Sequence, residues 1–175
     1  MISALTILFL VLPLPIVFLL HVAEEAFVQH VWILRHREAM GQCIPCLRTV
    51  FPVHWGLSTK AFLIAVVEEF VVMLVVTAYV LVRGPWCTEL WSVVFMAFVL
   101  RIVVRVVQAI AMRGYVPGLV TSVLLLPYAC LGVGSLYSHF SIAGFVLIVL
   151  AGCAFAALNL RLAHWVGVKS ASKRS

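Results

Sequence analysis

His21, Glu24 and Glu25 stand together as the motif H-x-x-E-E in the first apolar stretch of the chain. At about 100° per residue of helix, the three side chains fall within an arc of roughly 100° on one helix face. A His and a Glu one helical turn apart offer two ligands of the kind that metal ions bind, and carboxylates also serve as general acids or bases. The motif therefore predicts a divalent-metal site or an acid–base centre on this helix.

Ionisable residues also interrupt two later apolar stretches, although a charge inside a membrane costs roughly 2.5–3.5 kcal/mol. The glutamates in the apolar stretches outnumber the arginines, so a net negative charge remains. One divalent cation would cancel it, as would protons taken up by desolvated carboxylates. The candidate catalytic residues are Glu24, Glu25, Glu68, Arg101 and Arg105. The candidate metal ligands are His21, Glu24, Glu25, Glu68 and Glu69. The wider polar cluster adds Gln108, Thr121 and Asn159.

The composition of the chain is typical of a protein that lies in lipid. Of its 175 residues, 65% are hydrophobic and 10% are charged, whereas a soluble domain is about half apolar and a quarter charged. The net charge of +6 fits anionic lipid headgroups and membrane topology better than nucleic acid. We therefore expect one domain over residues 1–168, with membrane lipids as partners, in a cell membrane such as the bacterial inner membrane.

Five stretches are long enough to cross a bilayer, which takes roughly 20 apolar residues. We predict an all-α integral membrane bundle with helices over residues 2–33, 61–82, 90–112, 115–137 and 142–165. Pro13 and Pro15 should bend the first helix, and Pro117 should lie in the first turn of the fourth. No Lys or Arg precedes Arg35 and no small-residue cleavage site follows Leu20, so we expect the first helix to be retained.

The basic residues predict how this bundle is oriented. Five spans place nine of them on one side of the membrane: Arg35, Arg37, Arg48, Lys60, Arg113, Arg161, Lys169, Lys173 and Arg174. Only Arg83 falls on the other side. Because basic loops stay in the cytoplasm, we expect the N-terminus outside and the C-terminus inside, with residues 169–175 as a disordered basic tail.

Polar residues of separate helices fall at one depth in this topology. Glu68 lies about seven residues, or roughly 10 Å, from the cytoplasmic end of its helix, and Arg105 lies about as far from the cytoplasmic end of its own. We therefore expect one polar centre in the cytoplasmic half of the bilayer. Because Glu68 and Glu69 point about 100° apart, we expect only one of them to face this centre.

A second motif accompanies the first. Tyr115-Val116-Pro117-Gly118-Leu119-Val120-Thr121 reads Y-x-P-G-x-x-T, and together with H-x-x-E-E it resembles the HXXEE-domain family of small multi-pass membrane proteins. The resemblance implies metal binding through H-x-x-E-E and an N-x-x-x-H motif, but no settled function. The first motif maps onto His21, Glu24 and Glu25. The second is not present, and Arg101 and Arg105 stand where it is expected; guanidinium only donates hydrogen bonds and cannot bind a metal.

Two features have two interpretations each. Arg101 and Arg105 could pair with the glutamates, or could bind a phosphate or carboxylate group because the guanidinium fork fits oxyanions. Cys43-Ile44-Pro45-Cys46 is a C-x-x-C pair, which serves redox chemistry or half of a zinc site in other proteins. No second C-x-x-C follows it, and a role for Cys43 and Cys46 is the weaker interpretation.

Three functions remain open on the sequence. The first is an intramembrane enzyme that uses one divalent ion, for which zinc, iron and manganese all suit His and Glu, on a lipid-like or anionic small substrate. The second is a proton- or cation-coupled transporter or ion-binding protein, which at this size would form a homo-oligomer. The third is an accessory membrane subunit whose charges serve assembly.

Overall fold

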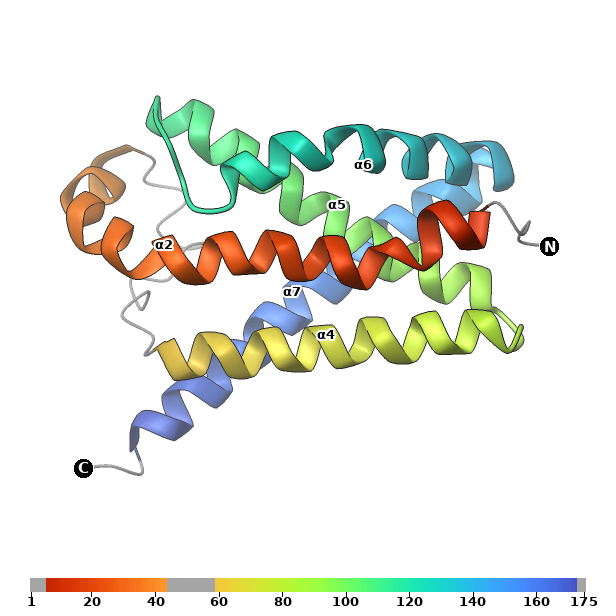
Figure 1. Cartoon of the computed structure of the whole chain (residues 1–175), viewed down its shortest axis with the longest axis horizontal. Helices are drawn as coiled ribbons and strands as arrows, with labels where there is room; N and C mark the ends of the chain where they lie inside the picture. Colours follow the sequence, from red (N-terminus) through yellow and green to blue (C-terminus); the bar gives the residue numbers. More distant parts are fainter. Residues whose placement is uncertain (1–5, 44–58, 173–175) are drawn as a thin grey trace.

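The computed structural model describes residues 6–43 and 59–172. These residues form helices and short turns, and no strand occurs among them. In chain order the elements are η1 (Ile7–Val11), α2 (Pro13–Cys43), α4 (Thr59–Leu81), α5 (Cys87–Met112), α6 (Leu119–His139) and α7 (Ile142–Ser172). Figure 1 shows α2 and α4 side by side, with α5 and α7 crossing behind them. The expected all-α architecture is confirmed.

The start of the first helix adapts to its two prolines. Pro13 is the first residue of α2, a position that needs no backbone N–H. Ahead of it, η1 is one turn of π-helix, in which the N–H of Leu12 donates to the carbonyl of Ile7 at 3.0 Å. A wider turn of this kind accommodates the bonds that prolines remove. The helix still packs inward, since Val11, Leu14 and Phe18 are almost fully buried.

The helices α4 and α5 end in the same turn. An arginine takes a positive φ in each, 53° at Arg83 and 49° at Arg113. The N–H of the glycine that follows donates to the carbonyl five residues before it, at 3.3 and 3.1 Å. This is the Schellman motif, which satisfies the last carbonyls of a helix. It places two exposed arginines at opposite ends of α5.

The connection from α5 to α6 is longer than expected. We predicted that the fourth helix begins at Tyr115, but α6 begins at Leu119. Pro117 therefore precedes the helix instead of lying in its first turn. The reason is Gly118, which precedes the first helical residue with a φ of 84°, a left-handed conformation that ends any helical run upstream of it.

The last helix is longer than expected. It continues from Ile142 to Ser172, so residues 169–172, which we expected in a disordered tail, are helical. Lys, Ser and Ala are all compatible with a helix interior, and no proline interrupts this stretch. Residues 173–175 lie outside the described part of the chain.

The core of the bundle is centred on α5, which packs against α2, α4, α6 and α7. Trp91, Phe95 and Phe98 of α5 are almost fully buried. At Gly132 the helix α6 comes so close that an added Cβ would lie 2.0 Å from the Phe95 ring. The absence of a side chain at Gly132 is therefore what allows α5 and α6 to approach.

The outer surface is suited to lipid. Large apolar side chains point outward along the helices, and Phe27, Ile110, Leu124 and Leu131 are each more than two-thirds exposed. Four stretches are long and apolar enough to cross a membrane: Ile7–Gln29, Cys87–Met112, Leu119–His139 and Ile142–Asn159. The described side chains of α4 begin at Val66, so the fifth span expected over residues 61–82 stays a prediction. The architecture is compatible with a membrane protein.

Candidate functional site

Polar side chains from four helices meet inside the bundle. We call this set the His21 cluster, and it contains His21, Glu24, Glu25, Glu69, Arg101, Arg105, Gln108 and Thr121. The hydroxyl of Tyr115 joins it from the turn before α6. Residues as far as 100 positions apart in sequence are thus in contact.

His21 and Glu25 form the buried centre of the cluster. They are one turn apart on α2, and neither is exposed. His21 Nε2 lies 3.1 Å from Glu25 Oε1. This distance is that of an ion pair when the imidazole is protonated, but the two atoms are not aligned as a hydrogen bond. The imidazole and the ring of Phe98 are nearly perpendicular, with 6.1 Å between their centroids.

Two arginines of α5 compensate the buried Glu25 carboxylate. Arg105 Nε donates to Glu25 Oε1 at 2.6 Å, and Arg101 Nη2 lies 3.7 Å from Glu25 Oε2. Arg105 also donates from Nη1 to Gln108 Oε1 at 2.9 Å. A carboxylate without exposure is tolerated only when it is paired. The pairing interpretation of the two arginines is therefore the one that the geometry supports.

Arg101 extends the network to α4. Its Nη1 donates to Glu69 Oε2 at 2.5 Å. Its guanidinium carbon lies 5.6 Å from the centre of the Phe18 ring, within the range of a cation–π interaction. Of the Glu68-Glu69 pair, Glu69 is thus the member that contacts the cluster.

Glu24 faces α6 instead of the arginines. Its carboxylate accepts the backbone N–H groups of Val120 and Thr121 at 3.2 and 2.7 Å. These are N–H groups of the first turn of α6, which have no partner within their own helix. Gly118, at the position where a capping side chain usually stands, has none to offer. A carboxylate from α2 therefore caps α6 and complements the positive end of its dipole.

Gly118 also makes room for the centre of the cluster. A Cβ added there would lie 3.0 Å from Glu25 Cγ and 3.0 Å from His21 Cε1. Position 118 thus requires glycine for its φ and for this close approach. We did not place Gly118 among the site residues; its position in Y-x-P-G-x-x-T is the sequence signal that points to it.

Tyr115 is a second residue that we had not assigned to the site. Its hydroxyl donates to Glu24 Oε1 at 2.7 Å, and its carbonyl accepts a hydrogen bond from Trp32 Nε1 at 2.7 Å. Partial burial and the bond to the Glu24 carboxylate raise the pKa of Tyr115 to about 12. The turn before α6 is therefore attached to α2 at two points.

An unbroken series of contacts joins the surface to the buried imidazole. Tyr115 is 39% exposed, and its hydroxyl contacts one oxygen of Glu24. The other oxygen of Glu24 accepts from Thr121 Oγ1 at 2.6 Å. Thr121 Oγ1 in turn lies 2.9 Å from His21 Nδ1. Every step is within hydrogen-bonding distance.

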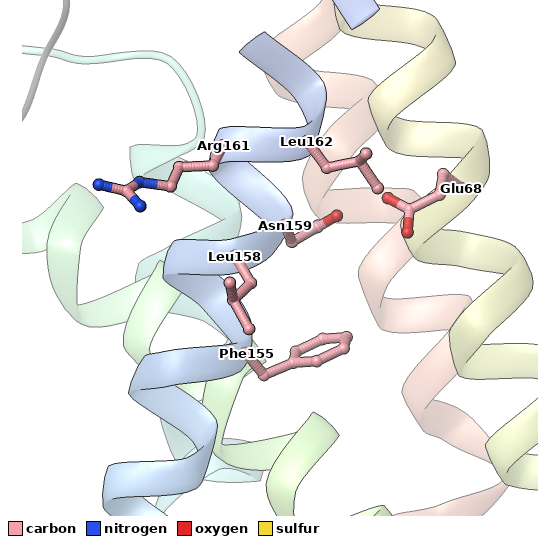
Figure 2. Close-up of a pocket in the computed structure, with 6 residues that line it drawn as sticks. All are labelled: Glu68, Phe155, Leu158, Asn159, Arg161 and Leu162. Atoms are coloured by element: carbon pink, nitrogen blue, oxygen red, sulfur yellow. The ribbon is translucent and has the colours of Figure 1, made fainter. Parts of the chain in front are cut away.

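Glu68 and Asn159 lie apart from the His21 cluster. They line a groove of about 520 Å³ between α4 and α7, together with Phe155, Leu158, Arg161 and Leu162. Figure 2 shows the Glu68 carboxylate on α4 facing Asn159 on α7. The expected single polar centre is therefore divided between the His21 cluster and the groove between α4 and α7.

The residues of the cluster do not fit a divalent metal in this arrangement. Glu25 Oε1 is already in contact with Arg105 and His21, and both oxygens of Glu24 accept hydrogen bonds from the first turn of α6 or from the turn before it. A metal would have to displace a guanidinium, which carries the positive charge itself. Within residues 6–43 and 59–172, no three His, Cys, Asp or Glu groups gather around one point. The Cys43–Cys46 motif lies outside the described side chains.

Comparison with known proteins gives a family and no function. No curated protein and no solved structure matches the chain. Residues 12–132 match a family described as "Protein of unknown function with HXXEE motif". The matched residues include both motifs and all eight members of the His21 cluster. The chain therefore belongs to the HXXEE family.

Proposed function

We propose that this protein is a five-span membrane protein whose His21 cluster binds one exchangeable proton, which places it in the ion-binding or proton-coupled class. The observation that carries the proposal is the continuous path of hydrogen-bonding groups from the exposed Tyr115 hydroxyl to the unexposed His21 ring.

The charge balance supports one bound proton. The cluster holds three carboxylates and two guanidiniums, which leaves one negative charge uncompensated. Buried charge is costly in a bundle surrounded by lipid. One proton on His21 would make the cluster neutral.

The hydrogen-bond partners of His21 also support placing the bound proton on its ring. The Thr121 hydroxyl has one hydrogen. It is donated to the Glu24 carboxylate, 2.6 Å away, because a hydrogen bond to a charged acceptor is the strongest one available. Thr121 Oγ1 then accepts from His21 Nδ1. On the other side of the ring, Nε2 lies 3.1 Å from a carboxylate oxygen that can only accept. Each ring nitrogen thus has an acceptor within 3.1 Å, which suits a doubly protonated imidazole.

The path favours proton exchange on one side of the membrane. Arg35 and Arg113 are exposed near the turn that carries Tyr115, whereas Arg83 lies at the other end of α5. By the distribution of basic residues, the Tyr115 end faces the cytoplasm. In this orientation the proton enters from the cytoplasm through Glu24 and Thr121. This arrangement supports ion binding over a metal-dependent enzyme, because His21 and Glu25 leave no exposed surface for a substrate.

Histidine NMR tests the proposal directly. The protein is labelled with ¹⁵N-histidine, purified in detergent, and the His21 signals are assigned by their loss in His21→Gln. We expect both ring nitrogens of His21 to carry a proton in the wild type, and Glu25→Gln to remove one of these protons. A ring that carries only one proton in the wild type would contradict the proposal.

Metal analysis separates the alternatives. The wild type, His21→Ala and Glu25→Ala are compared after purification without chelators. A stoichiometric metal that both substitutions remove would overturn the proton-binding proposal in favour of the metal-dependent enzyme. A metal-free wild type in which both ring nitrogens of His21 carry a proton would support it.

A further inference from the structure

The groove between α4 and α7 has no role in the His21 cluster. Its volume of about 520 Å³ is within the range that holds a small ligand, roughly 300–1,000 Å³. The walls are mainly apolar, from Phe155, Leu158 and Leu162 of α7. Figure 2 shows these side chains along one side of the groove with Glu68 on the other, and the Arg161 guanidinium directed away.

Two polar groups in this groove lack a donor. Asn159 Oδ1 is buried and has no hydrogen-bond partner among the described residues. Within the same part of the chain, no donor contacts the Glu68 carboxylate, whereas the adjacent Glu69 is paired with Arg101. A buried acceptor without a partner costs free energy. Two acceptors that face each other across an apolar groove are complementary to a group with several N–H donors.

We infer that this groove binds the primary ammonium group of an amphiphile, with the ammonium between Glu68 and Asn159 and the alkyl chain along Phe155, Leu158 and Leu162. An ammonium group supplies a positive charge opposite the Glu68 carboxylate. It also has three N–H donors, and Asn159 Oδ1 can accept one of them. The surrounding lipid gives an alkyl chain access from the side, since Leu158 and Leu162 are exposed on the outer surface.

Photo-labelling tests this inference. The full chain is placed in phosphatidylcholine nanodiscs and exposed to a dodecylamine that carries a diazirine in its alkyl chain, and labelled peptides are identified by mass spectrometry. We expect labelling of the α7 peptide that contains Phe155 and Leu158. The half-maximal concentration should rise about tenfold in Glu68→Gln, which keeps the shape and removes the charge. Glu89→Gln is the matched control, because Glu89 lies in the first turn of α5, and it should label like the wild type.

Two further comparisons make the test decisive. The substitution Leu162→Trp fills the groove without changing Glu68, and it should abolish α7 labelling even if Glu68→Gln does not fold. The same diazirine on dodecanol, or on a trimethylammonium that has no N–H donor, should label at least several-fold less. Equal labelling by the amine and the alcohol, or an unchanged concentration in Glu68→Gln, would overturn the inference.

The source of the ammonium is resolved by competition. Phosphatidylethanolamine added to the nanodiscs lowers labelling if the natural ligand is an aminophospholipid headgroup. Free dodecylamine competes while phosphatidylethanolamine does not if the ligand is a single-chain amine. Either result supports the ammonium site. We expect both additions to leave the His21 NMR signals unchanged, so the ammonium site and the proton-binding proposal are tested separately.

Discussion

The two Glu-Glu pairs of this chain have the same sequence and different surroundings. Glu24 and Glu25 both receive strong donors, the first from the start of α6 and the second from two arginines of α5. In the second pair, only Glu69 is paired, while Glu68 lines a groove without a donor from the described residues. Adjacent residues on a helix point about 100° apart. The difference shows that the helices on either side, and not the dipeptide, decide which carboxylate is held.

The largest effect is expected at Glu25, the glutamate that is fully buried and lies beside two arginines. Glu25→Ala removes the buried carboxylate that Arg105, Arg101 and His21 share, while Arg101 keeps its bond to Glu69. Breaking a buried pair by removing one member costs about 3–5 kcal/mol, and we expect a loss of this size in the free energy of unfolding, measured by chemical denaturation in detergent. Glu68→Ala removes a carboxylate without such partners, and it should change the stability by less than about 0.5 kcal/mol. Equal losses for the two substitutions would remove the contrast between the pairs.

A smaller loss is expected from Gly118→Ala. The added Cβ must take a φ of 84° and would press on Glu25 and His21. A non-glycine residue in this conformation costs about 1–3 kcal/mol. Gly134→Ala is the matched control, since an added Cβ there meets nothing within 4 Å and alanine favours a helix. Thermal unfolding of both variants in the same detergent measures the difference, and a Gly118→Ala variant as stable as Gly134→Ala would mean that the close approach at 118 is not needed.

The next largest loss of stability is expected when the Glu24 cap on α6 is removed. Glu24→Gln keeps the size of the side chain and removes the charge that the first turn of α6 receives. Loss of a good cap costs about 1 kcal/mol, so denaturation should show a loss near this value. Thr121→Val should cost a similar amount, because it removes the hydroxyl between Glu24 and His21. If the two effects add fully in the double variant, Glu24 and Thr121 do not act through one shared contact.

The smallest effect is expected in the titration of the Tyr115 hydroxyl. The pKa of Tyr115 is raised to about 12, above the usual value near 10, so the neutral phenol is favoured in the folded protein. Its contribution to stability is complete below about pH 10 and is lost as the pH rises through about 12. Tyrosine absorbance against pH should show one late-titrating group that disappears in Tyr115→Phe, and that moves toward its usual value in Glu24→Gln. A Tyr115 that titrates near pH 10 would mean that its bond to Glu24 is absent.

The sequence predicted the elements of this structure better than its site. Apolar length predicted the middle helices to within a few residues, except where Gly118 delays the start of α6. It did not predict that α2 and α7 continue as helix beyond their apolar stretches, to Cys43 and Ser172. It also placed His21, Glu25 and Arg105 at a common depth, and these residues do meet. Depth alone could not separate Glu68 and Asn159 from the cluster, because the rotation of α4 and α7 depends on side-chain packing. The cap from Glu24 on α6 depends on a contact between residues 97 positions apart, which no local pattern encodes.

The ion pairs of α5 have a consequence for how the protein is made. Both acidic partners of its arginines, Glu25 and Glu69, precede Arg101 and Arg105 in the chain. In the five-span arrangement that we propose, the helices with the glutamates would enter the bilayer before α5, because ribosomes synthesise from the N-terminus. Each unpaired arginine would cost roughly 2.5–3.5 kcal/mol on insertion. The order of segments in the gene thus lets the earlier helices receive α5, and a version with α5 moved to the front would have to enter the lipid with its charges unmatched.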